Sequence, residues 1–511
     1  MSNLKSVLRD IGAILIIIGF VVLLTLIVTF STGEYLPSSG FNAVFPILIT
    51  SAIFFGVGSP LFYFFRKAEE ADFKSAMITA ALGWFLISLI CSIPFWLIPY
   101  DISSGAYFTM DPLSAFFESM SGWTGTGLTM VDNEQYLPYT LQFYRSLIQW
   151  VGGVGVIVLT LSILSRPGVG SFVLYQGEAR ERKTHPSIIS TVRTIWWIFI
   201  LYTVLGIVAL TAIGLLYPSS GMSVWESINH AMTGIATGGF SVTDDSIAGF
   251  GIVSQIVVMI LMVFGGVAFA AHFDLLKGKI KDFLADTQFK AMMFLIFLGV
   301  LAITFLNAES VYSYDWVTSL QVSSFQFISA ISCTGFASVE NLPLWSDSAK
   351  LILAFAMVIG GAAGSTAGGI KLFRAVLLYK GVGWRIKRAI STPRRVFVHK
   401  FGDKALSKDE AMDLINEAAI ISFIWVIILS TGIIVVSTVV SRTLPNVTLS
   451  DVIFEVCSAQ GNVGLSTGIT RLEMNYIPKI MLIFNMWIGR LEIIPIIVLI
   501  RSIFGLRKNI I

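Results

Sequence analysis

Apolar runs of about 20 residues alternate with short polar segments along almost the whole chain. An α-helix rises 1.5 Å per residue, so a run of this length matches the roughly 30 Å hydrocarbon core of a bilayer. The pattern predicts ten membrane-spanning helices, at residues 11–30, 42–65, 75–98, 141–164, 188–216, 251–275, 289–306, 349–378, 415–440 and 477–500. The sequence therefore predicts an all-α polytopic membrane protein.

Composition agrees with this fold class, because 55% of the residues are hydrophobic, 13% are charged and the mean hydropathy is +0.81. The first apolar run is long enough to span and no small-residue cleavage site follows it, so we expect it to stay in the bilayer. The 3 cysteines and 4 histidines are scattered, without the spacing of a disulfide framework or a metal site. Redox and metal chemistry gain no support.

The basic residues fix the orientation. With the N-terminus inside, most of the 34 lysines and arginines fall in cytoplasmic loops, and the positive-inside rule then places both termini in the cytoplasm. Five bases fall outside: Arg145, Lys350, Arg442, Arg471 and Lys479. Acids gather there, among them Asp111, Glu118, Asp132, Glu134, Asp244, Asp245, Glu340, Asp347 and Glu473. Such a face attracts cations, although the outer loops of any membrane protein are poor in bases.

After the first two spans, the chain divides into four similar units, each a span, a short helix, a glycine-containing loop and a second span. The predicted boundaries are 1–70 for the N-terminal helix pair and 71–186, 187–284, 285–408 and 409–511 for the four repeats. Each short helix has a start signal, from Asp111-Pro112, Ser223 with Glu226, Thr318 with Gln321, and Thr448 with Asp451. At about 12 residues, or roughly 18 Å, these helices enter the membrane only half-way.

A glycine segment follows each short helix, at 121–129, 233–240, 330–336 and 460–465. Aligned on Gly127, Gly238, Gly335 and Gly464, the copies are 111, 97 and 129 residues apart, which indicates an internal repeat. The aligned glycines lie 16, 15, 17 and 16 residues after the helix start signals.

Irregular backbone at membrane depth is tolerated only where it is buried in protein or lines a water-filled cavity. Four such segments therefore indicate one shared pore, with the negative ends of the short helices directed at a cation and with carbonyl oxygens replacing its water. Close packing of membrane helices is the alternative role for glycine, and we assign that role to Gly152, Gly153, Gly155, Gly265 and Gly266.

These four motifs resemble the pore loops of the Trk/Ktr/HKT potassium-transport superfamily, and the extra N-terminal spans are similar to its TrkH branch. The resemblance covers nearly the whole chain and implies four repeats around one pseudo-fourfold pore, with K⁺ as the transported ion. Glycine rather than serine at position 127 implies potassium, while unequal residues at Gly125, Ala236, Cys333 and Asn462 imply weaker discrimination against sodium. The implied filter residues are Thr124, Gly125, Thr126, Gly127, Ile235, Ala236, Thr237, Gly238, Ser332, Cys333, Thr334, Gly335, Gly461, Asn462, Val463 and Gly464.

A second glycine cluster interrupts the eighth span. Its residues are Gly360, Gly361, Gly364, Ser365, Gly368, Gly369 and Lys371. Glycine costs about 1 kcal/mol per position in a helix, so we expect a break. The resemblance implies an intramembrane gating loop, and a simple kink is the alternative. Arg490, deep in the last span, is expected to face a cavity or partner below the filter; a structural ion pair is the other possibility.

The loop 380–408 carries nine bases and one acid, Asp403. Anionic lipid head groups would account for this charge. The resemblance implies a homodimer and a separate cytosolic nucleotide-binding ring of the RCK (TrkA) type; no nucleic-acid partner is expected. Three classes of function stay open: a channel-like potassium uptake subunit, a sodium- or proton-coupled potassium symporter, and a membrane enzyme or receptor, the last without any catalytic motif.

Overall fold

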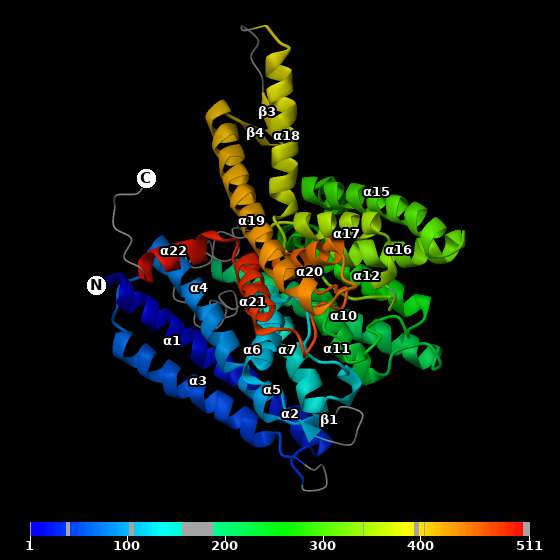
Figure 1. The fold of residues 1–511 in the computed structure, drawn as a ribbon. Coiled ribbons are helices and arrows are strands. Elements are labelled where there is room, and N and C mark those ends of the chain that lie inside the picture. Colours follow the sequence, from blue (N-terminus) through cyan, green and yellow to red (C-terminus); the bar gives the residue numbers. More distant parts are fainter. Residues whose placement is uncertain are drawn as a thin grey trace.

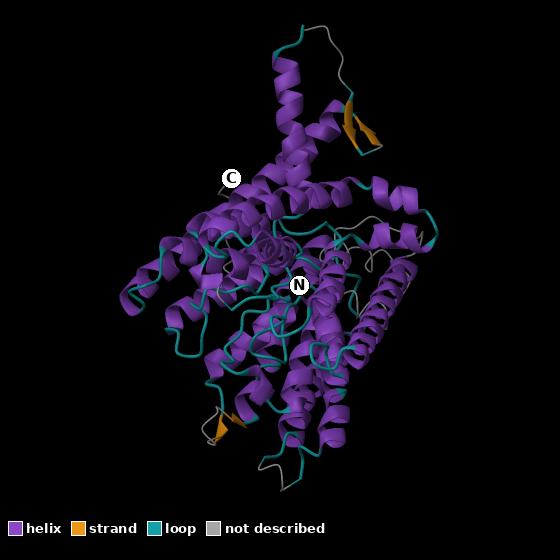
Figure 2. Cartoon of the chain, turned by 90° about the vertical axis from the view of Figure 1, so that its right-hand side faces the viewer, coloured by secondary structure: helices purple, strands orange, loops and turns teal. Residues whose placement is uncertain are grey.

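The computed structural model describes residues 2–36, 41–101, 107–155, 188–340, 342–392, 398–402 and 404–503. This part of the chain is helical apart from two short antiparallel hairpins at opposite ends of the molecule (Figures 1 and 2). β1 (Tyr100–Asp101) pairs with β2 (Tyr107–Phe108), and β3 (His399–Phe401) pairs with β4 (Lys404–Leu406).

The N-terminal region forms a tight helix pair against the rest of the molecule (Figure 1). Its helices are α1 (Ser2–Leu23), α2 (Thr25–Thr32) and α3 (Val44–Phe65). A β-carbon added at Gly12 would lie 2.6 Å from the backbone nitrogen of Phe62, and one at Gly58 would lie 2.9 Å from the carbonyl oxygen of Gly12. Small residues at the crossing therefore allow the two helix backbones to touch, as is common in membranes.

Four repeated units follow. The first contains α4 (Phe73–Ile90), α5 (Ile93–Leu97), α6 (Pro112–Thr124) and α7 (Tyr139–Val154); the second contains α10 (Ile188–Leu216), α11 (Val224–Ile235), α12 (Ile252–Gly266), α13 (Phe269–Leu276) and α14 (Ile280–Ala285). The third contains α15 (Thr287–Ser310), α16 (Trp316–Ile331), α17 (Asp347–Ile359) and α18 (Leu372–Ala389); the fourth contains α19 (Lys408–Thr443), α20 (Leu449–Gly461), α21 (Tyr476–Arg490) and α22 (Ile494–Ile503). Two 3₁₀ turns, Glu134–Tyr136 and Leu342–Leu344, lie in loops that the sequence predicts to be outside.

Among the described residues, the structure contains fewer unbroken membrane-spanning helices than the ten that the sequence predicts. By length and composition, six continuous helical stretches among the described residues are able to cross a membrane. Two further predicted spans are sharply bent pairs, α12 with α13 at 110° and α21 with α22 at 114°. The predicted span 349–378 is divided between α17 and α18. Residues 156–164 of the predicted span 141–164 lie outside the described residues, as do Arg394, Arg395 and Asp403 of the basic loop.

Each of the four short helices starts at a capping side chain. Asp111 accepts from the backbone nitrogens of Leu113 and Ser114, while Ser223 and Thr448 form complete capping boxes. In the third repeat the expected start at Thr318 is wrong, because Asp315 accepts from the nitrogens of Val317 and Thr318. α16 is consequently 16 residues long, against 12 or 13 for the other three.

The end of α18 and the start of α19 extend away from the main helical body (Figure 1). α19 has 36 residues and is therefore about 54 Å long, well beyond the roughly 30 Å of a hydrocarbon core. Lys387 and Arg388 lie in the last turn of α18. The described bases of the predicted cytoplasmic loop are thus carried on a projection made of the end of α18, the β3–β4 hairpin and the start of α19.

Candidate ion-conducting site

The four short helices end in the same way, and this similarity defines equivalent positions. At each helix end, one backbone nitrogen donates to the carbonyl oxygen five residues earlier. The donors are Thr126, Gly238, Thr334 and Val463, and the distances are 2.8, 2.8, 2.9 and 2.9 Å. In such a helix end the residue before the donor takes the left-handed conformation, and here this residue is Gly125, Thr237, Cys333 or Asn462. The residue that follows each donor is Gly127, Gly239, Gly335 and Gly464, and their φ values are 88°, 76°, 90° and 105°.

The alignment of the second repeat on Gly238 is therefore wrong by one residue. Gly239 has the left-handed φ that its counterparts share, whereas Gly238 is equivalent to Thr126. Gly239 was absent from the predicted filter residues. The cap distance could have identified it, since Ser223 to Gly239 spans 16 residues, as do Asp111 to Gly127 and Thr448 to Gly464.

The four segments close into a ring, here called the glycine ring (Gly127, Gly239, Gly335 and Gly464). A β-carbon added at Gly127 would clash with the carbonyl oxygen of Gly238. The same holds for Gly239 with the oxygen of Thr334, for Gly335 with that of Val463, and for Gly464 with that of Thr126. Each repeat thus contacts the next, in the order 1, 2, 3, 4 and back to 1.

Glycine is required in this ring for two independent reasons. A positive φ disfavours side chains with a β-carbon, and a neighbouring carbonyl occupies the space that the β-carbon would need. Two residues earlier, Gly125, Thr237, Cys333 and Asn462 also have positive φ, between 50° and 67°. The three non-glycine residues are held in a conformation that a β-carbon resists, so the surroundings must fix the backbone there.

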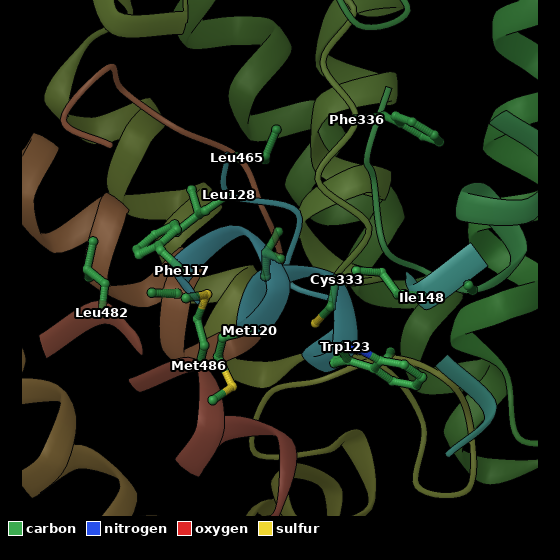
Figure 3. Close-up of a cluster of buried hydrophobic side chains, with 14 of the residues drawn as sticks. Phe117, Met120, Trp123, Leu128, Ile148, Cys333, Phe336, Leu465, Leu482 and Met486 are labelled. Atoms are coloured by element: carbon green, nitrogen blue, oxygen red, sulfur yellow. The ribbon is translucent and has the colours of Figure 1, made fainter. Parts of the chain in front are cut away.

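Polar and apolar side chains both support the ring. Thr124 and Thr126 share a hydroxyl hydrogen bond of 2.7 Å, Ser332 and Thr334 share another of 2.7 Å, and Asn462 donates to Thr126 Oγ1 at 2.9 Å. Figure 3 shows the buried apolar side chains that pack around these segments. They include Phe117, Met120, Trp123, Leu128, Leu465 and Met486.

Two buried glutamates hold the chain where it leaves the ring. Glu118 accepts from the backbone nitrogen of Met130 at 2.8 Å and from Arg145 Nε at 2.8 Å. Glu455, at the equivalent position of repeat 4, accepts from the nitrogens of Thr467 and Thr470 at 2.9 and 3.0 Å. Their carboxylates are thus used in structural hydrogen bonds behind the ring.

Three of the bases expected outside are buried and paired. Arg145 forms an ion pair with Glu118 at 2.8 Å, and Lys350 forms one with Asp451 at 2.6 Å. Lys479 donates a hydrogen bond to the hydroxyl of Ser114 at 2.7 Å and lies 3.9 Å from Asp111. Each pair joins one base to one acid, so the net negative charge predicted for the outer face is unchanged. Asp244, Glu340, Asp347 and Glu473 remain exposed there. Partial burial, followed by the charge of Glu473, raises the pKa of Asp132 above its usual value.

The glycine cluster between α17 and α18 forms a compact loop, here called the crossing loop (residues 360–371). Its two ends approach each other, because the nitrogen of Ile370 donates to Val358 and that of Lys371 to Ile359. Gly360, Gly364 and Gly369 have positive φ, and Lys371 does as well, at 83°. Lys371 Nζ donates to the carbonyl of Ala367, and Ser365 Oγ donates to that of Ala362.

The crossing loop contacts the ring segments of two repeats. Thr366 Oγ1 lies 2.9 Å from the carbonyl oxygen of Gly265 and 3.2 Å from that of Ile235, the two acceptors for its proton. It accepts from Thr237 Oγ1 at 3.0 Å, and all three partners belong to repeat 2. β-carbons added at Gly368 and Gly361 would meet Asn462 Cβ of repeat 4 at 3.0 Å and the Gly266 carbonyl oxygen of repeat 2 at 3.0 Å. The helix break predicted here is present, directly against the helix ends that lead into the ring.

Arg490 connects the crossing loop to the other repeats. Its guanidinium donates to the carbonyl oxygen of Thr366 at 2.9 Å and to those of Gly152 and Gly153 at 2.6 and 2.8 Å. Arg490 belongs to repeat 4. Two of the residues that it contacts lie against repeat 2, which is opposite repeat 4 in the ring: Thr366 contacts Ile235, and Gly153 contacts Ala236. The side chain therefore joins repeat 4 to repeats 1 and 3 beside the repeat 2 segment that leads into the ring. Close by, Arg374 and Glu492 form an ion pair.

Comparisons with known proteins are consistent with this architecture. The sequence model of the TrkH family, described as cation transport protein, matches residues 43–505. The chain is 34% identical over 503 residues to an uncharacterized cation transporter of Methanocaldococcus jannaschii, covering 98% of this chain and 96% of that protein. It is 31% identical over 460 residues to the Trk system potassium uptake protein TrkH of Escherichia coli strain K12, covering 88% and 89%.

A solved structure shows the same fold. The crystal structure of the potassium transporter TrkH from Vibrio parahaemolyticus superposes with a TM-score of 0.80 at 24% identity, covering 98% of this chain and 99% of that one. The predicted superfamily and the predicted fold class, a polytopic membrane protein with repeated helix and pore-loop units, are confirmed. From the match to the family model and these relatives, we conclude that the chain belongs to the TrkH family of cation transport proteins.

Proposed function

We propose that this protein takes up potassium ions across the cell membrane through the glycine ring. The observation that carries the proposal is the closure of four equivalent backbone segments, in which the glycine of each repeat lies beside a carbonyl oxygen of the next. Backbone carbonyls arranged around an axis replace the hydration shell of K⁺. Relatives at about one-third identity carry the name of a potassium uptake protein, which supports K⁺ as the ion.

The short helices add a second favourable term. Each of α6, α11, α16 and α20 ends at the ring, so four helix C-termini with partial negative charge are directed toward one place. In a medium of low dielectric constant such charges stabilise a cation more than they do in water. The predicted filter residues together with Gly239 are the proposed ligands and their immediate supports.

We propose the crossing loop and Arg490 as the gate. In this proposal the guanidinium places a positive charge in the path of a cation below the ring, and its hydrogen bonds to the crossing loop and to repeat 1 keep the loop there. Opening then requires the loop to leave Arg490 and Ile235. The loop continues directly into α18, which projects from the body beside α19, so a force on that projection would reach the loop.

The projection is also the proposed regulatory face. It carries bases at the end of α18, and a cytosolic nucleotide-binding subunit of the RCK type is the partner we propose for it, with nucleotide bound by that subunit. We further propose a homodimer, both termini in the cytoplasm, and the four repeat boundaries given above.

Flux of Rb⁺, a K⁺ substitute, into proteoliposomes tests the function. With the membrane voltage clamped and without a sodium or proton gradient, the proposal predicts Rb⁺ uptake that excess K⁺ inhibits. Uptake that appears only when a sodium or proton gradient is applied would identify a coupled symporter. Absence of Rb⁺ uptake under both conditions would contradict the proposal.

A further inference from the structure

One side chain of repeat 1 holds the ring segment of repeat 2. Gln149 on α7 is fully buried, and its Nε2 donates to the carbonyl oxygen of Gly238 at 2.6 Å. Its Oε1 accepts from the backbone nitrogen of Phe240 at 3.0 Å. The two hydrogen bonds lie on either side of Gly239, so they fix the backbone around that member of the glycine ring.

Gly238 and Gln149 compensate for each other. The residues equivalent to Gly238 are Thr126, Thr334 and Val463, all with β-branched side chains. A β-carbon at Gly238 would lie 2.5 Å from the Cδ of Gln149 and 3.0 Å from its Nε2. The amide of Gln149 thus fills the place that a side chain occupies in the other three repeats.

The amide is specific to repeat 1. In each repeat the helix after the ring segment (α7, α12, α17 or α21) has a glycine at or next to its end: Gly152, Gly265, Gly360 and Gly489. The residues three positions before these glycines are Gln149, Met262, Met357 and Met486. All four side chains are fully buried. Three repeats therefore use an apolar side chain where repeat 1 uses a hydrogen-bonding one.

We infer that Gln149 is a positioning residue that sets the direction of the Gly238 carbonyl and thereby the preference of the ring for potassium over sodium. This inference rests on the proposed function. Since Gly238 is glycine, its backbone lacks the restriction that β-branching gives the other three segments. Without the amide, the Gly238 carbonyl is free to rotate, and a smaller ion is then coordinated more easily.

The test compares Gln149→Met, which copies the other repeats, with Gln142→Met. Gln142 lies on the same helix and also joins repeat 1 to repeat 2, because its Oε1 accepts from Trp225 Nε1 at 2.6 Å, away from the ring. Gln149→Met removes both hydrogen bonds, of which the one to the Gly238 carbonyl oxygen acts on a proposed ligand. Its loss, at about 1 kcal/mol, corresponds to about a fivefold change, so Gln149→Met is expected to lower the Rb⁺/Na⁺ flux ratio about fivefold. Gln142→Met should leave the ratio unchanged, even if it lowers the melting temperature.

A second comparison does not require Gln149→Met to fold. Gly238→Ala should lose folded yield because its methyl group meets Gln149, and adding Gln149→Ala should recover the yield while the flux ratio stays low. The inference is overturned if folded Gln149→Met keeps the ratio, if Gln142→Met lowers it equally, or if Gly238→Ala alone resembles the unmodified protein. Absence of Rb⁺ flux in the unmodified protein would instead overturn the proposed function.

Discussion

Arg490 donates a hydrogen bond of 2.9 Å to the carbonyl oxygen of Thr366, although the two residues are 124 positions apart in the chain. The bond joins the end of α21 in repeat 4 to the middle of the crossing loop in repeat 3. Because the same guanidinium also holds Gly152 and Gly153 of repeat 1, one side chain ties three repeats together below the ring.

Arg490→Ala should therefore raise the resting cation flux severalfold, since it removes both the charge and three hydrogen bonds to backbone carbonyls. Each such charged bond contributes about 1.5–3 kcal/mol when buried. Rb⁺ uptake into proteoliposomes measures the effect. Arg501→Ala, an exposed arginine on α22, is the matched control and should not change the flux. Equal flux in Arg490→Ala and the unmodified protein would refute the role assigned to Arg490.

Gly239→Ala should abolish most of the Rb⁺ uptake. The methyl group would clash with the carbonyl oxygen of Thr334, and the positive φ of 76° adds strain. Gly383→Ala is the control, because it lies on α18 and has no neighbouring atom within 4 Å of the added carbon. If Gly239→Ala transports normally, the register assigned here to repeat 2 is wrong.

The ion pair between Arg374 and Glu492 should couple the crossing loop to the bend between α21 and α22. Both side chains are largely buried, and Glu492 and Ile493 have positive φ, at 57° and 75°. We expect Arg374→Glu and Glu492→Arg each to change resting flux and to lower stability by about 1–3 kcal/mol. The double substitution should restore both properties. A double variant that is no better than the sum of the single variants would show that the pair does not act as a unit.

Glu34 should stabilise the attachment of the N-terminal helices. Its carboxylate accepts from the backbone nitrogens of Tyr139 and Thr140 at 2.7 and 2.8 Å, so it caps α7 from another part of the chain. Loss of a helix cap costs about 1 kcal/mol. Glu34→Ala should accordingly lower the melting temperature in detergent, whereas Glu309→Ala, at an exposed helix end, should not. Identical melting of all three proteins would exclude this capping role.

The repeated architecture could be predicted from the sequence because its signals are local. Helix caps such as Asp111 and Ser223, the glycines that follow them and the length of the apolar runs each mark one element. Four copies of the same order of signals then indicate one fold. The break at residues 360–371 was predictable for the same reason, since several glycines close together destabilise a helix.

Other features depend on contacts that the sequence does not reveal. Gly238 and Gly239 are both glycine, and although the 16-residue cap distance favours Gly239, the backbone of the structure decides between them, because Gly239 has a φ of 76° and the Gly238 nitrogen bonds to Thr233 as that of Thr126 does to Ser121. Asp315 and Thr318 are both able to cap a helix, so the start of α16 was ambiguous. The bends after Gly266 and Arg490 lie between apolar segments on both sides, and hydropathy therefore does not detect them.

Crystals of this protein grown in Rb⁺ would test the central claim most directly, through the anomalous scattering of the ion. The account predicts an Rb⁺ peak on the axis of the glycine ring, within coordination distance of the carbonyl oxygens of Thr126, Gly238, Thr334 and Val463. A well-ordered ring with no Rb⁺ peak, or an Rb⁺ peak bound only elsewhere in the protein, would contradict it.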